Sequence, residues 1–256
     1  MTVQRPNNID LYIVGAGVSF PEHLTLQTLD VLAACRTICS NLPQSDLDLL
    51  PEHLRARCTT LWPLYQDSRD RSANYNDVTW AVIEAVERMQ PVAWLTPGHP
   101  LIFDSVSQAL LQEGLARKWN VSVLPAISSI DTVLAQLGYD PAHGLVVYEA
   151  TALVAWNMPL VPHFATLLLQ PSAFGTSNAH YGTGWSPNLD SLRDHLRQYF
   201  PDDHQCAFVR SHSPQTGTAH VEWWPIGEMT GVPFDTVAGS TLFVPGYAAE
   251  ATQEPG

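Results

Sequence analysis

Basic residues are scarce in this chain. Its 256 residues include 12 lysines and arginines together against 25 aspartates and glutamates, which gives a formal net charge of -13. A surface with that balance repels the phosphate backbone of nucleic acid and the headgroups of anionic lipids. We therefore expect neither nucleic acid nor a membrane as a partner.

Cysteines and long apolar runs are also few. The four cysteines form no CxxC pair, so they indicate neither a metal site nor a disulfide framework, and they favour reduced thiols in the cytoplasm. The first apolar run ends at Gly15 and Gly17. This run is too short for a signal peptide or a membrane span. These features predict a soluble cytoplasmic protein without a bound metal.

Apolar patterning in the first half of the chain alternates between strand and helix periods. Strands are expected at 10–17, 36–40, 91–100 and 121–125, and helices within 23–35, 76–89, 106–119 and 128–138. Such alternation predicts an open parallel α/β sheet, whose ligand site lies where the strands end in loops.

The second half has more strands than helices. Strands are expected at 145–151, 164–170, 205–211, 220–226 and 240–246, with one further helix at 190–200. This pattern predicts a mixed α/β domain with a substantial antiparallel part. We expect an N-terminal domain over residues 1–125, a C-terminal domain over 126–247, and a disordered tail over 248–256.

Three short motifs at predicted strand ends are candidates for ligand binding. They are GAG at 15–17, GHP at 98–100, and the serine pair at 128–129. Each also has an ordinary structural explanation. The first lacks the third glycine of a dinucleotide fingerprint, the histidine fits a solvated turn, and serine is a common helix cap.

The order of these motifs is more specific than any one of them. The succession of a strand with GAGVSFPEHLT, a strand with GHPLIF, and LPAISSID resembles the tetrapyrrole methylase family, which uses S-adenosylmethionine as methyl donor. His99 replaces the aspartate of that family's usual Gly-Asp-Pro. GHP, ISSIDTVLAQLGYDP and YEAT (148–151) are similar to the borosin peptide α-N-methyltransferases, which methylate backbone amides of ribosomally made peptides. The resemblance covers residues 10–246.

The resemblance implies two α/β domains with the methyl donor bound in the cleft between them. It implies that S-adenosylmethionine, and S-adenosylhomocysteine as product, contact a set of eight residues: Gly15, His99, Ile102, Phe103, Ser128, Ser129, Gln170 and Thr241. Two positions depart from the family pattern. Pro97 stands where related enzymes can carry an aromatic residue, and Ala126 replaces the usual glycine.

The stretch YQDSRDRSANY at 65–75 holds two tyrosines and two arginines. Alternating charges of this kind are typical of a solvated loop. In the borosin enzymes, however, a tyrosine, an arginine six positions later and a tyrosine four beyond that line the reaction site. The resemblance therefore implies that Tyr65, Arg71 and Tyr75 are catalytic, although Arg69 lies close enough to be the arginine that matters.

The chemistry of amide methylation explains why such groups are needed. A peptide nitrogen is a poor nucleophile because its lone pair is delocalised into the carbonyl. Tyr75 or Tyr65 as a phenolate could accept the amide proton, and Arg71 could favour that phenolate and stabilise charge growing on the amide oxygen. The spacing leaves open which tyrosine is the base.

We expect a methyltransferase that acts on a separate precursor peptide supplied in trans, because the sequence after 240–246 has no room for the helices and core peptide that borosin enzymes carry there. A shortened chain is the alternative explanation. The resemblance also implies a homodimer. Two other functions stay open: a small-molecule or tetrapyrrole methyltransferase, disfavoured by the single lysine, Lys118, and a non-catalytic peptide-binding homologue. A nicotinamide dehydrogenase is less well supported than either of these functions, because the glycine fingerprint is incomplete.

Overall fold

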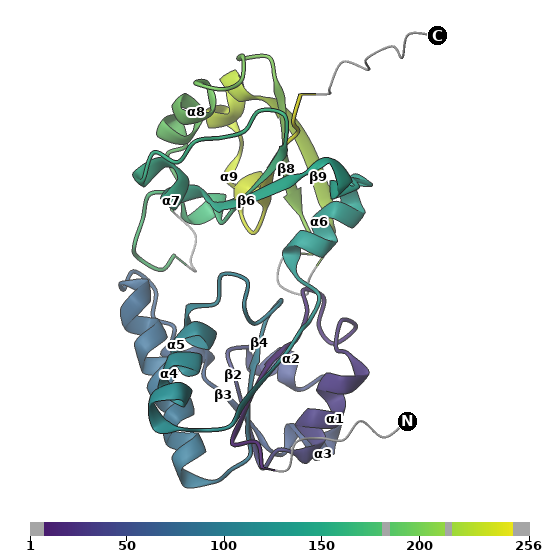
Figure 1. Cartoon of the computed structure of the whole chain (residues 1–256), viewed down its shortest axis with the longest axis vertical. Helices are drawn as coiled ribbons and strands as arrows, with labels where there is room; N and C mark the ends of the chain where they lie inside the picture. The colour runs from purple at the N-terminus through teal and green to yellow at the C-terminus, as the bar shows by residue number, and fades with distance from the viewer. Residues whose placement is uncertain (1–7, 181–184, 213–216, 248–256) are drawn as a thin grey trace. The chain divides into compact units, whose positions relative to one another are not determined.

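Two sheets organise the chain, one in each of the units Met1–Ser129 and Ile130–Gly256. The computed structural model describes residues 8–180, 185–212 and 217–247 (Figure 1). The disordered tail expected at 248–256 lies outside these described residues. Within them, the helices are all too short or too polar to cross a membrane.

The sheet of the first unit is parallel throughout, as the sequence predicts. Its strand order is β3-β2-β4-β1-β5, and all of its strand pairs run in the same direction. The strands are β1 (Leu11–Gly15), β2 (Thr37–Ser40), β3 (Cys58–Thr60), β4 (Val92–Thr96) and β5 (Val121–Leu124). Every residue of β1 and β4 is buried, which is typical of central parallel strands covered on both faces.

Alternate side chains of the central strands enter two separate cores. Tyr12 and Val14 of β1 pack with helices α1 (Leu26–Ala34), α2 (Gln44–Leu47) and α3 (Glu52–Arg55). Leu11 and Ile13 pack on the opposite face with α4 (Arg71–Arg88) and α5 (Ser105–Arg117). Figure 1 shows these two groups of helices on opposite sides of the sheet. The two-residue period of a strand therefore fixes which helices cover each face.

Helix α4 begins five residues earlier than the sequence pattern predicts. The carboxylate of Asp70 accepts hydrogen bonds from the backbone N–H groups of Ser72 (2.9 Å) and Ala73 (3.3 Å), which caps the helix at Arg71. The predicted start at Asn76 was wrong. The first turn of the helix is polar, so the apolar pattern used for the prediction does not reach back to Arg71. As a result, Arg71 and Tyr75 both lie on a helix, and neither is part of a loop.

The second unit contains a mixed sheet with the order β6-β7-β10-β8-β9. Only β6 and β7 pair in parallel; the other neighbours are antiparallel, which confirms the predicted mixed character. The strands are β6 (Leu145–Glu149), β7 (Ala165–Leu169), β8 (Gln205–Arg210), β9 (His220–Pro225) and β10 (Thr241–Val244). The strand expected at 145–151 ends at Glu149, whose carboxylate caps α7 (Ala150–Ala155).

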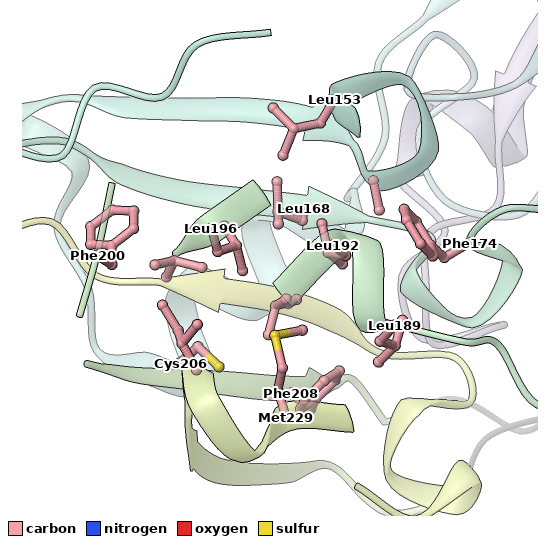
Figure 2. Packing of buried hydrophobic residues seen from close by; sticks show 14 of the residues in the cluster. Leu153, Leu168, Phe174, Leu189, Leu192, Leu196, Phe200, Cys206, Phe208 and Met229 are labelled. Carbon is pink, nitrogen blue, oxygen red and sulfur yellow. The ribbon is translucent and has the colours of Figure 1, made fainter. Parts of the chain in front are cut away.

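One face of this sheet carries the larger core of the unit. Figure 2 shows Leu168 and Phe208 from the strands beside Leu192 and Leu196 of α8 (Asp190–Leu196), with Met229 near them. The other face packs against α6 (Ser129–Leu137), whose Val133 is fully buried. The second unit therefore has helical cover on both sides of its sheet.

The indole of Trp94 gives a test of the first unit's packing. Trp94 is fully buried on β4, and its Nε1–H donates to Ser107 Oγ on α5 at 3.1 Å. Ser107→Ala leaves this buried donor unpaired and should lower the free energy of unfolding by about 1–3 kcal/mol. Urea titration followed by tryptophan fluorescence measures the change.

The exposed Ser105, on the same helix, provides the matched control. Ser105→Ala should change the free energy of unfolding by less than about 0.5 kcal/mol. Equal stability of the two variants would contradict the role assigned to the Trp94–Ser107 hydrogen bond.

Candidate functional site

Three loops at the carboxyl edge of the parallel sheet meet at Gly15. A Cβ atom on this glycine would lie 2.2 Å from the carbonyl oxygen of Gly98, 2.5 Å from the Cβ of Ala126 and 2.9 Å from the Cδ of Pro100. No side chain fits there. The GAG and GHP motifs are therefore brought together at one edge of the sheet, and Ala126, two residues before the serine pair, packs against the same glycine.

Backbone hydrogen bonds lock two of these loops to each other. The N–H of Gly17 donates to the carbonyl of Gly98 (3.2 Å), and the N–H of Gly98 donates to the carbonyl of Gly17 (2.8 Å). Both glycines have positive φ, +74° and +66°, a region that other residues enter only with strain. Both turns therefore require glycine for their conformation, and a Cβ atom added at Gly17 would also lie 2.1 Å from the Cβ of His23.

The GHP loop presents an imidazole and an aromatic ring. His99 Nδ1 accepts a hydrogen bond from the backbone N–H of Leu101 at 3.1 Å, so the neutral ring carries its proton on Nε2. Phe103 has a φ of 54° and is 47% exposed. A bulky residue with positive φ is uncommon, and such strained positions cluster at ligand sites.

The remaining residues expected to contact the donor lie at other strand and helix ends. Ser128 is buried and directly precedes α6, which begins at Ser129. In the second unit, Gln170 follows β7 with a φ of 58°, and the buried Thr241 begins β10. The pairing of Leu242 with Leu168 brings the start of β10 beside the end of β7, so Gln170 and Thr241 lie at the same edge of their sheet.

The two tyrosines predicted to be catalytic are in contact. Tyr65 ends the short 3-10 helix η1 (Trp62–Leu64), and its ring centroid lies 6.2 Å from that of Tyr75 on α4, with the ring planes at 64°. Arg71 is one helical turn before Tyr75, which puts both on the same face of α4. The structure therefore brings together residues that the sequence places ten positions apart.

Arg69, the alternative arginine, is engaged elsewhere. Its guanidinium forms an ion pair with Asp77 at 2.6 Å and a long hydrogen bond to Asn74 Oδ1 at 3.4 Å. Asn74 is fully buried, and its Nδ2 donates to the carbonyl of Gln66 at 2.8 Å. These contacts fasten the segment after Tyr65 to the first turns of α4.

Asn41 and Asn74 are two residues that sequence reasoning missed. The Nδ2 of Asn41, in the loop after β2, donates to the hydroxyl of Tyr65 at 3.3 Å. Neither asparagine belongs to a motif or an apolar stripe, and Asn41 is far from Tyr65 in the chain. The sequence carries no local signal that would have identified either of them.

The electrostatic surroundings of Tyr75 oppose its ionisation. Burial raises the pKa of the Tyr75 hydroxyl above its ordinary value; the Arg71 guanidinium acts in the opposite direction, and the Asp104 carboxylate raises it further. Arg71 thus lowers the pKa of Tyr75, as expected, but the effect of burial is larger and the pKa is raised. Asp104 caps α5 through Oδ1, which accepts from the Ser107 N–H at 2.9 Å. Its Oδ2 is buried and makes no hydrogen bond within the described part of the chain.

Comparison with known proteins identifies the family. The sequence profile described as Tetrapyrrole (Corrin/Porphyrin) Methylases matches residues 10–220. Since this match spans most of the 256 residues, the chain belongs to the tetrapyrrole methylase family. The family confirms the predicted fold class, and its description as methylases agrees with the predicted methyltransferase activity.

Curated relatives include borosin proteins of fungi. The chain is 25% identical over 228 residues to a methyltransferase/type I borosin cyclic peptide precursor of Coprinopsis marcescibilis, covering 88% of this chain and 58% of that protein. It is 27% identical over 215 residues to a type II borosin precursor of Phlebiopsis gigantea, covering 83% of this chain and 38% of that protein. The chain thus spans less than two thirds of the length of these relatives.

Solved structures with the same fold are tetrapyrrole methylases. The uroporphyrin-III-C-methyltransferase from Thermus thermophilus has a TM-score of 0.62 at 19% identity, over 92% of this chain and 93% of that one. The methyltransferase CobJ has a TM-score of 0.64 at 14% identity, over 94% and 95% of the two chains. At these identities the likeness establishes the fold and nothing finer.

Gly15→Ala tests the close approach of the three loops. The added methyl group would overlap the Gly98 carbonyl, so we expect the variant to lose about 1–3 kcal/mol of unfolding free energy and to bind S-adenosylmethionine more weakly. Thermal unfolding and calorimetric titration measure the two effects.

Gly231→Ala is the matched control, because no atom lies within 4 Å of a Cβ added there and its φ is not positive. It should leave both quantities close to those of the parent. Parental stability and donor binding in Gly15→Ala would show that the loops do not require glycine at this contact.

Proposed function

We propose that this chain N-methylates backbone amides of a ribosomally made precursor peptide, with S-adenosylmethionine as donor. The observation that carries the proposal is the Tyr65–Tyr75 ring contact with Arg71 one turn away on α4. Its curated relatives, which are methyltransferases joined to borosin peptide precursors, support the same chemistry.

The three side chains match what an amide acceptor requires. The amide must lose its proton as the nitrogen attacks, and a tyrosine phenolate is an acceptor of suitable basicity. Arg71 would stabilise negative charge that develops on the amide oxygen. The nitrogen gains the methyl group, the tyrosine gains the proton, and the demethylated donor leaves as a neutral thioether.

The residues at the carboxyl edge of the first sheet fit a bound donor. The packing at Gly15 leaves backbone exposed where a side chain would otherwise stand, His99 Nε2–H is a hydrogen-bond donor, and the exposed ring of Phe103 can stack on a purine. Ser128 and Ser129 would add hydroxyl groups in the same unit. Once bound, the donor supplies an electrophilic methyl group on a sulfonium.

Supply of the peptide in trans and assembly as a homodimer belong to the proposal. In the curated relatives the methyltransferase and the precursor are one protein, so adding a separate peptide to the purified chain tests supply in trans directly. Sedimentation equilibrium tests the second. A fully active monomer would contradict the proposed homodimer without contradicting the proposed N-methylation.

A small-molecule or tetrapyrrole acceptor is the second candidate function. The description of the family as Tetrapyrrole (Corrin/Porphyrin) Methylases favours it. The net charge of -13 and the single lysine, Lys118, disfavour an acceptor with several carboxylates. A peptide-binding homologue without activity is the third outcome that the experiment below distinguishes.

Substitution of the site residues tests the proposed chemistry. Tyr75→Phe and Arg71→Ala should each lower the rate of peptide methylation by at least about 100-fold, because each removes a group that acts on charge in the transition state. Donor affinity should stay within a few-fold of the parent. Single-turnover assays by mass spectrometry and calorimetric titration provide the two measurements.

Arg69→Ala is the matched control for Arg71→Ala, since Arg69 is held by Asp77. It should retain activity within about tenfold of the parent, a change of no more than ~1.4 kcal/mol in the barrier. The catalytic assignment is wrong if Tyr75→Phe and Arg71→Ala both methylate at the parental rate.

A further inference from the structure

The carboxylate of Asp104 is hydrogen-bonded through only one of its two oxygen atoms. Its Oδ1 accepts the Ser107 N–H at 2.9 Å and caps α5, whereas its Oδ2 is buried and has no hydrogen-bond partner among the described residues. A buried carboxylate oxygen without a partner costs free energy, because it has lost its contact with water. This oxygen is therefore a candidate to stabilise positive charge that a ligand brings.

The position of this carboxylate is fixed by its neighbours in the chain. The carbonyl of Asp104 accepts the Gln108 N–H at 3.2 Å, in the first turn of α5. Ser107, whose N–H binds the carboxylate, is fully buried and accepts the indole N–H of Trp94 at 3.1 Å. On the other side, Phe103 has a φ of 54°. Both α5 and β4 thus hold the carboxylate in place before a ligand binds.

The Asp104 carboxylate lies near the proposed site of methyl transfer. Burial raises the pKa of Tyr75, the Arg71 guanidinium lowers it, and the Asp104 carboxylate raises it, so this carboxylate is close enough to act on the Tyr75 hydroxyl through its charge. Asp104 also directly follows Phe103, whose exposed ring is proposed to stack on the donor's purine. Since the acceptor nitrogen must contact the methyl group that it attacks, a group near Tyr75 is also near the sulfonium.

A bound sulfonium would place a second positive charge beside a guanidinium. Arg71 acts on the same hydroxyl as Asp104, with the opposite sign. Like charges at close range repel each other, so a cationic donor needs a compensating anion. Asp104 is the carboxylate that acts on Tyr75 in the described part of the chain, which makes it the group able to offset this repulsion.

A sulfonium suits a carboxylate oxygen that lacks a hydrogen-bond partner. It carries a full positive charge but no N–H or O–H group, so a carboxylate stabilises it through charge alone. Such interactions are screened less at buried sites than at the surface. Loss of the methyl group removes this charge, because S-adenosylhomocysteine is a neutral thioether at the same position. The carboxylate therefore attracts the donor in a way that it cannot attract the product.

We propose that Asp104 is the anionic group that makes the site favour the charged donor over its neutral product. The inference rests on the proposed function, which assigns S-adenosylmethionine as the donor. Asp104 contributes to the affinity for the donor, and this contribution is lost once the methyl group has been transferred, which promotes release of the product. Asp104 is thus a specificity-determining residue of the donor site, supported by α5.

Calorimetric titration of the ligand-free protein with donor and product tests the inference in the absence of any peptide. Asp104→Asn removes the negative charge, while its amide oxygen still caps α5. The dissociation constant of S-adenosylmethionine should rise about tenfold, and that of S-adenosylhomocysteine by less than about twofold. An analogue with a protonated amine in place of the sulfonium should lose affinity as S-adenosylmethionine does.

Two further variants separate the effect of the charge from other effects. Asp104→Ser keeps a capping oxygen without a carboxylate, so it should give the same ratio of the two dissociation constants as Asp104→Asn. Glu113→Gln is the matched control, because it removes one negative charge near the other end of α5, where Glu113 pairs with Arg117 at 3.0 Å. It should leave both dissociation constants within about twofold of the parent, since surface charges far from a site are screened.

Equal weakening of donor and product binding by Asp104→Asn overturns the inference, because Oδ2 would then bind a hydroxyl or ammonium group that the two ligands share. Unchanged affinity for S-adenosylmethionine also overturns it. The proposed function fails in a different way: if the two affinities change as expected and no peptide is methylated, the acceptor is wrong and the role of Asp104 stands. A parent protein that binds neither ligand would reject both.

Discussion

The approach of three loops to Gly15 is the constraint on which the rest of the structure depends. Parallel strands place their carboxyl ends at one edge, so the loops after β1, β4 and β5 converge there. Packing to backbone contact excludes a side chain at Gly15 and fixes the GHP loop through its bonds to Gly17. This leaves His99 and the exposed ring of Phe103 at the edge where open α/β sheets bind their ligands.

The second structural element of the account is the N-terminus of α4. Asp70 begins the helix early enough for Arg71 and Tyr75 to share a face, and Asn74 fastens the preceding segment so that Tyr65 meets Tyr75. Burial and the Asp104 carboxylate raise the pKa of Tyr75, whereas the Arg71 guanidinium lowers it. Asn41 Nδ2 donates to the hydroxyl of Tyr65.

Much of the fold could be predicted from the sequence because it depends on local patterns. Unbroken apolar runs such as that of β4 predict central parallel strands, and the order of glycine, histidine and serine motifs predicted the family. The start of α4 could not be predicted, since its polar first turn shows no apolar period. Asn41 contacts Tyr65 across 24 positions of sequence, a tertiary contact without local signal. The pKa of Tyr75 depends on burial, which spacing to Arg71 does not reveal.

The location of the transferred methyl group tests the central claim most directly. The purified chain is incubated with S-adenosylmethionine labelled in its methyl group and with a separate borosin-type precursor peptide, and the product is sequenced by tandem mass spectrometry. The account predicts label on backbone nitrogen atoms of the peptide. Label on a side chain or a small molecule, or none on the peptide in a protein that binds the donor, would contradict it.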